Sequence, residues 1–136
     1  MSEDFTIQEK IELIIDLFNS YGYNAETIDD FPIAKRFIAA GYADLNVNNV
    51  YVKNKRGADY LHDTIEMISK DLISIMKKNS WSMPLDDMLP WFIENYCLSD
   101  KNTGELLMEY ILNNLSVYGY NVYHSRKKDK YVLEKI

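Results

Sequence analysis

The sequence predicts a mainly α fold with two small β-hairpins, that is, an α+β class. Three observations support this. Apolar residues recur at helical spacing along most of the chain, the segment 45–52 has a polar turn between two strand-like halves, and a second strand pair follows residue 119. With 136 residues, of which 47% are hydrophobic, the chain can bury the core of one compact domain or of two small units.

The first helix is expected at about residues 6–20. Thr6 and Glu9 have the spacing of a capping box, and apolar residues follow along one helical face. Tyr21 and Gly22 should end this helix, because glycine readily takes the left-handed conformation found after a helix.

A short helical turn is expected at about 25–29, followed by a helix that ends near Ala40. Asp30 should cap that helix, Pro32 suits its first turn, and Gly41 should end it. Its apolar side chains should face inward and its basic ones outward: Ile33, Phe37 and Ile38 against Lys35 and Arg36.

Residues 45–52 predict a hairpin with a two-residue turn at Asn48-Asn49, since Asn tolerates left-handed conformations. The expected cross-strand pairs are Val47 with Val50 and Leu45 with Val52. This register would place four apolar side chains on one face of the ribbon.

The longest helix is expected at about 57–78. Its apolar stripe has a spacing near 3.5 residues and requires a packed partner along its length: Leu61, Ile65, Ile68, Leu72 and Ile75. The simplest arrangement makes this helix a shared spine for both halves of the chain.

Helical spacing continues over 82–97, where Pro90 should kink or restart the helix. A further helix is expected at about 102–117, capped by Asp100 or Asn102 and ended by Tyr118-Gly119. Residues 120–125 and 131–136, joined by a polar turn, then predict the second hairpin.

The first half resembles the winged-helix superfamily. The resemblance lies in the strand Val50-Tyr51-Val52, which runs through Lys55-Arg56-Gly57 into the helix start Tyr60-Leu61. It covers about residues 6–78, and residues 62–136 resemble the fold only in the order of elements. The resemblance implies a tandem arrangement: a winged-helix-like unit in 1–60, a shared helix in 57–78 and a second unit in 79–136.

The chain is acidic, with a formal net charge of −6 and a pI near 4.9. Only the segment after residue 100 has an excess of bases. An acidic protein is repelled by nucleic acid at long range, so binding to DNA would need local basic patches. The candidate nucleic-acid-binding residues are Lys35, Arg36, Lys53, Lys55, Arg56, Arg126, Lys127, Lys128 and Lys130.

No catalytic signature is found, so we expect a protein that is not an enzyme and uses no cofactor. His62, Asp63 and Glu66 share a helical face, but such groups usually decorate a surface, and no metal site is expected. The single cysteine, Cys97, should be a buried thiol. No apolar stretch approaches the ~20 residues that span a bilayer, and a cytoplasmic location is expected.

Two functional classes follow. In the first, the protein binds another protein, by self-association as a dimer along the Leu61–Ile75 stripe or by docking on a regulatory or host partner. The richness in Ile, Asn, Lys and Tyr suggests that the source is an A/T-rich bacterial or phage genome. Tyr, Trp and Met are enriched in interfaces, and the candidate contacts are Trp81, Met83, Met88 and Tyr123. In the second, which the winged-helix resemblance implies, helix 31–40 and the 45–52 wing bind DNA as a transcriptional regulator.

Overall fold

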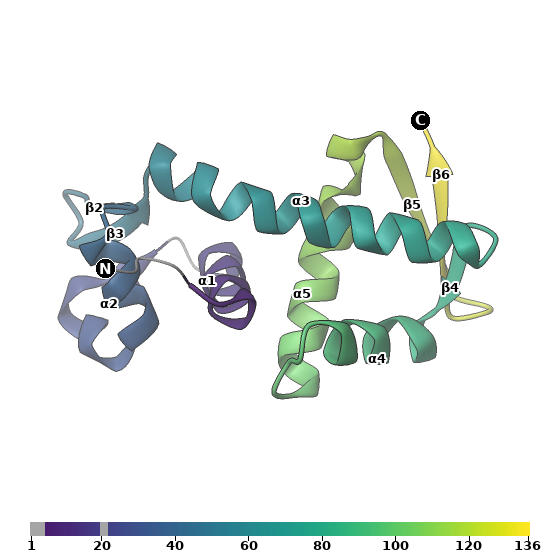
Figure 1. Ribbon diagram of the computed structural model, residues 1–136, viewed down its shortest axis with the longest axis horizontal. Helices are drawn as coiled ribbons and strands as arrows, with labels where there is room; N and C mark the ends of the chain where they lie inside the picture. Colours follow the sequence, from purple (N-terminus) through teal and green to yellow (C-terminus); the bar gives the residue numbers. More distant parts are fainter. Residues whose placement is uncertain (1–4, 20–21) are drawn as a thin grey trace. The chain divides into compact units, whose positions relative to one another are not determined.

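The computed structural model describes residues 5–19 and 22–136, and it is mainly helical with two three-stranded antiparallel sheets (Figure 1). The chain divides into two compact units, the first ending at Thr64 and the second beginning at Ile65. The expected α+β class with two hairpins is confirmed, and each hairpin gains a third strand that was not expected. None of the helices in the described residues combines the length and apolarity needed to span a bilayer.

The first unit contains one sheet with the helices that precede it, and it ends within the long helix described below. Its elements are α1 (Ile7–Asn19), β1 (Tyr23–Asn24), the 3-10 helix η1 (Ala25–Asp30), α2 (Pro32–Ala39), β2 (Ala43–Leu45) and β3 (Val50–Lys53). The strand order is β1-β3-β2, so β3 is central and pairs antiparallel with both neighbours.

Both helix starts that open this unit are capped by side chains. The capping box at α1 is confirmed: the Glu9 amide donates to Thr6 Oγ1 at 3.1 Å, and the Thr6 amide donates to Glu9 Oε1 at 2.9 Å. The expected turn at 25–29 is η1, and Asn24 caps it through a 2.8 Å bond from the Glu26 amide. The expected end of α1 falls partly on residues 20–21, outside the described residues.

The α2 helix spans nearly the expected residues, but Asp30 does not cap it. Asp30 is the last residue of η1, and Phe31 takes the cap position without a side-chain bond. Pro32 begins the helix, and Gly41 ends it with a φ of 87°, as expected. Phe37 is fully buried.

The first hairpin forms, but its predicted register is wrong by one residue. Leu45 pairs with Tyr51, and the loop has three residues instead of two, with Asn49 left-handed at a φ of 62°. Asn46 causes this change, because its Oδ1 accepts from the amides of Asn48 (2.9 Å) and Val50 (3.1 Å). The slip exposes Val47 fully, so the expected apolar face does not form.

The long helix α3 (Lys55–Lys78) is unbroken, as expected, and continues from the first unit into the second. Asn54 caps it by accepting from the Gly57 amide at 3.0 Å. Leu61, Ile68 and Leu72 are buried, whereas Ile75 is only half-buried and Met76 takes the fully buried position. The stripe is therefore part of the core of this chain.

The second unit adds two helices and a sheet to the end of α3. Its elements are β4 (Ser82–Pro84), α4 (Leu85–Asn95), α5 (Lys101–Asn114), the 3-10 helix η2 (Leu115–Tyr118), β5 (Tyr120–Ser125) and β6 (Lys130–Lys135). The strand order is β4-β6-β5, again with the last strand in the centre.

Two expectations for α4 are wrong. Residues 82–84 form a strand instead of a helix, because they pair with β6. Pro90 lies inside a single continuous helix, so the helix does not restart there, and of the two expected effects only a kink is left as a prediction. Pro90 is exposed, so water can solvate the carbonyl that its ring leaves without a donor.

The α5 helix begins as expected but ends at Asn114, and the 3-10 helix η2 continues to the expected stop at Tyr118-Gly119. Asp100 caps α5, accepting from the Thr103 amide at 2.7 Å, and Gly119 follows η2 with a φ of 89°. Gly104 is buried against Leu89 and Ile93 of α4, which lets the two helices pack closely. The second hairpin, β5 with β6, is confirmed.

Candidate binding groove

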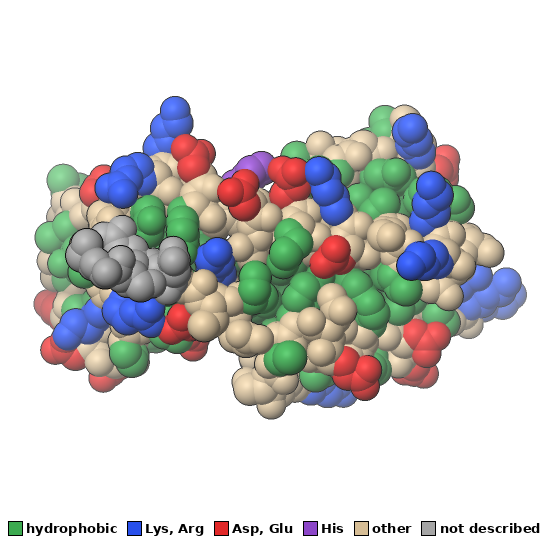
Figure 2. Space-filling model, in the orientation of Figure 1, with side chains coloured by type: hydrophobic (Ala, Val, Ile, Leu, Met, Phe, Trp, Pro, Cys, Tyr) green, Lys and Arg blue, Asp and Glu red, His purple; other side chains and the backbone are tan. Residues whose placement is uncertain are grey.

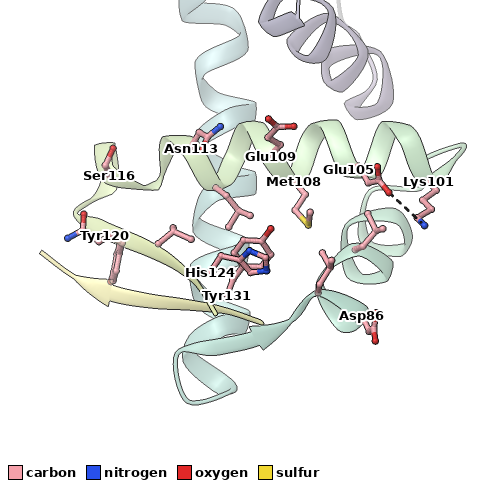
Figure 3. Close-up of a pocket in the computed structure, with 15 residues that line it drawn as sticks. Asp86, Lys101, Glu105, Met108, Glu109, Asn113, Ser116, Tyr120, His124 and Tyr131 are labelled. Atoms are coloured by element: carbon pink, nitrogen blue, oxygen red, sulfur yellow. Dashed lines mark ion pairs between the residues drawn. The ribbon is translucent and has the colours of Figure 1, made fainter. Parts of the chain in front are cut away.

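An open groove of about 770 Å³ lies in the second unit, between α5, the start of α4 and the β5-β6 hairpin (Figure 3). Its walls come from segments far apart in the sequence. The lining residues are Leu85, Asp86, Leu89, Lys101, Glu105, Met108, Glu109, Leu112, Asn113, Ser116, Tyr120, Asn121, Val122, His124 and Tyr131.

The α5 wall has an apolar floor and an acidic rim. Met108 and Leu112 form the floor with only 7% and 9% of their surface exposed, while Glu105 and Glu109 are exposed. Lys101 lies one turn before Glu105, with Nζ and Oε1 3.8 Å apart. An exposed pair at this distance leaves most of the acidic character in place.

The hairpin wall is aromatic. His124 and Tyr131 face each other across the β5-β6 ladder, and their rings stack with centroids 4.5 Å apart. His124 Nε2 lies 3.2 Å from Asp129 Oδ1, which holds the imidazole over Tyr131. In Figure 3 both rings lie between the hairpin and α5, so they form part of the groove surface.

The groove is electrostatically negative. Among the described residues that line it, three are acids, Asp86, Glu105 and Glu109, and one is a lysine, Lys101. Burial and the negative charges of Asp129 and Glu109 raise the pKa of Tyr131, so this phenol stays neutral and able to donate a hydrogen bond. The arrangement suits a ligand with positive charge and some apolar surface.

The four residues predicted to bind protein do not form one surface. Met83 and Met88 are buried and belong to the core of the second unit. Trp81 is half-buried and stacks on Tyr120 at 5.8 Å, beside the groove. Tyr123 is 50% exposed, on the face of β5 opposite to Val122.

The basic residues of the first unit are partly neutralised. Lys35 pairs with Asp29 at 2.7 Å, and Arg36 pairs with Glu9 while its guanidinium lies 4.6 Å from the Phe5 ring centroid. Lys53, Lys55 and Arg56 lie at the end of β3 and the start of α3, with Arg56 packed 5.2 Å from the Tyr42 ring centroid. Lys10, in α1, lies 4.9 Å from the Tyr60 ring centroid.

The basic residues of the second unit lie at the tip of its hairpin. Arg126, Lys127 and Lys128 are exposed in the β5-β6 turn, and Lys130 is half-buried at the start of β6. On the face shown in Figure 2, Lys and Arg side chains are interspersed with Asp and Glu.

The structure gives no support for a metal site at His62, Asp63 and Glu66. Glu66 pairs with Lys70 at 2.7 Å, and no His, Cys, Asp or Glu group of three or more in the described residues has metal-binding geometry. Cys97 is exposed, contrary to expectation, because it follows α4 in a left-handed turn while the neighbouring Tyr96 takes the buried position.

The sequence does not predict the groove as a site. Its parts are joined only by tertiary packing, and the available signal was the acidic stripe of Glu105 and Glu109 beside aromatic residues of the hairpin. Comparison with protein-family models, curated proteins and solved structures finds no match to this chain.

Proposed function

We propose that this chain is a tandem winged-helix protein that is not an enzyme and acts by binding another protein, in a regulatory or inhibitory role. The first unit has the order helix, strand, helix, helix, strand, strand from α1 to β3, and the second repeats it from α3 to β6 with the 3-10 helix η2 added before β5. Each sheet has its third strand in the centre. These shared features support the winged-helix assignment for both units, including the second, where the sequence resemblance is weaker.

The observation that carries the proposal is the acidic surface of α5. In a winged helix that binds DNA, the helix before the hairpin enters the major groove. Here that helix presents Glu105 and Glu109 to the groove, where they would repel phosphates. The same carboxylates attract Lys and Arg side chains of a protein.

The corresponding helix of the first unit supports the same conclusion. The bases of α2 are Lys35 and Arg36, and each already pairs with an acid. A phosphate would have to compete with Asp29 and Glu9 for them. Exposed pairs are weak, so this lowers the affinity for DNA without abolishing it.

Charge reversal on α5 tests the proposal. We expect the wild-type protein to bind random-sequence duplex DNA no better than an acidic control protein, measured by fluorescence anisotropy at about 50 mM salt. The variant Glu105→Lys/Glu109→Lys should gain DNA binding that weakens steeply as salt rises. Tight, salt-dependent DNA binding by the wild type would refute the proposal.

DNA binding by the first unit is the second candidate, as a transcriptional regulator with helix 31–40 and the 45–52 wing. The observation in its favour is the group of Lys53, Lys55 and Arg56, next to the hairpin and extending onto α3. If this function is correct, reversing these three charges should abolish binding, while Glu105→Lys/Glu109→Lys should change it little.

A further inference from the structure

The strand β5 is the edge of its sheet, and its backbone is paired on one side only. The Ile136 amide donates to the Gly119 carbonyl at 2.8 Å, which places Gly119 in a hydrogen-bonded pair of the antiparallel ladder. Hydrogen-bonded and non-hydrogen-bonded pairs alternate along such a ladder. The backbone groups of every second residue from Gly119 onward, at Asn121, Tyr123 and Ser125, therefore bond to β6. The N–H and C=O groups of Tyr120, Val122 and His124 point outward, and no described residue pairs with them.

This edge lacks the features that usually protect exposed strands. The other edge strands have two or three residues, and β4 contains Pro84. β5 has six residues and contains no proline, lysine, arginine or acid. An edge of this kind is a template for pairing with another chain.

The groove lies along the same edge. Val122 and His124 line it from the inner face of the sheet, and Asn121, whose side chain points to the opposite face, lines it too. The groove therefore reaches around the outer side of β5. A strand added there would project alternate side chains between the sheet and α5.

The surroundings define those side chains. A side chain in the groove would lie beside apolar surface at Met108 and Leu112 and beside the exposed carboxylates of Glu105 and Glu109. Lys and Arg fit this combination of surfaces, because their aliphatic stems pack on apolar surface while their charged ends reach acids.

We propose that an extended segment of a partner protein, with Lys or Arg at alternate positions, binds as a fourth strand along β5 with those side chains in the groove. This rests on the proposed function and adds the conformation and charge pattern of the partner. A second copy of this chain is a poorer occupant, because β5 itself has no lysine or arginine to place beside the carboxylates of the groove.

The test uses a dye-labelled, end-capped hexapeptide of alternating lysine and valine, with binding measured by fluorescence anisotropy. We expect saturable binding that becomes at least about tenfold weaker when glutamate replaces lysine. Two further peptides carry N-methyl groups on alternate amides, in opposite phase. Only the phase that faces β5 should lose binding, by at least about tenfold, because an added strand bonds through every second residue.

Protein variants provide the matched controls. Glu105→Gln/Glu109→Gln should weaken binding of the lysine peptide and reduce its salt dependence, while Glu134→Gln, an exposed acid on β6 outside the groove, should not. Val122→Pro removes an outward N–H without removing a bond to β6, so it should weaken binding while circular dichroism stays native.

Four results would overturn this inference. These are equal binding of both N-methylated peptides, tighter binding of a helical basic peptide, self-association of the protein that Val122→Pro abolishes, and no binding of the lysine peptide. The first two would leave protein binding by the groove intact. The proposed function fails separately, through DNA binding by the wild type.

Discussion

Gly57, in the first turn of α3, lies directly against the backbone carbonyl of Tyr42, with no space between them for a β-carbon. Asn54 links the same two segments: its amide donates to the Tyr42 carbonyl at 3.1 Å, and its side chain accepts from the Gly57 amide at 3.0 Å. This close approach joins the start of the long helix to the chain that enters the first hairpin.

The variant Gly57→Ala should therefore destabilise the first unit by about 1–3 kcal/mol, because a backbone atom blocks the new methyl group and must move. Chemical denaturation measures this change. Gly104→Ala is the control: its β-carbon would meet only side-chain atoms of Ile93 and Leu89, which can shift, so the loss should be smaller. An equal or smaller loss for Gly57→Ala would contradict the packing described here.

Ser80 follows α3 in a left-handed conformation with a φ of 61°, and Trp81 follows with 65°. Replacing Ser80 with glycine should stabilise the protein by about 1 kcal/mol, because glycine adopts this conformation without steric cost. The same substitution at Ser74, inside α3, should destabilise it by about 0.5 kcal/mol. Thermal denaturation of both variants checks the opposite signs.

Asp16 should make the first unit less stable as pH rises. Burial raises the pKa of this carboxyl above its ordinary value of 3.8, although the Tyr23 hydroxyl donates to it at 2.8 Å and partly opposes the shift. The folded state then holds the proton more tightly than the unfolded state, so stability falls as pH rises from 3.8 upward. Asp16→Asn keeps an acceptor for Tyr23 and should remove that fall in denaturation measured from pH 3 to 7. A variant curve parallel to the wild type would contradict this.

Asp100 has the opposite effect. Hydrogen bonds from the backbone and side chain of Thr103 lower the pKa of this capping carboxyl, so its stabilisation is present above pH 3.8 and is lost as pH falls through its lowered pKa. Asp100→Ala should lower the midpoint of thermal unfolding at pH 7 and change it less at pH 2. Asp100→Asn can still accept the bond from the Thr103 amide, so its unfolding midpoint at pH 7 should lie between those of the wild type and Asp100→Ala. Equal losses at both pH values would exclude the charge as a cause.

Elements fixed by neighbouring residues could be predicted from the sequence. The capping residues at Thr6 and Asp100, the stops at Gly41 and Gly119, and the length of α3 all depend on local geometry. The third strand of each sheet could not be predicted, because Tyr23–Asn24 and Ser82–Pro84 are too short to carry a strand pattern and form only by pairing with distant residues.

The errors in the hairpin and the site have specific causes. The register slipped because the Asn46 side chain bonds two backbone amides and opens the loop by one residue, a competition that Asn48-Asn49 alone does not reveal. Met83 and Met88, predicted as protein-binding residues, are buried in the core, because composition does not distinguish an interface from a core. The groove itself needs α5 and β5 placed side by side, which only the tertiary fold provides.

Amide hydrogen exchange along β5, followed by NMR, tests most directly whether this edge is open for a partner. The structure predicts alternation: slow exchange at Asn121, Tyr123 and Ser125, which bond to β6, and fast exchange at Tyr120, Val122 and His124. Uniformly slow exchange over residues 120–125 would mean that the edge is already covered, and it would contradict the account.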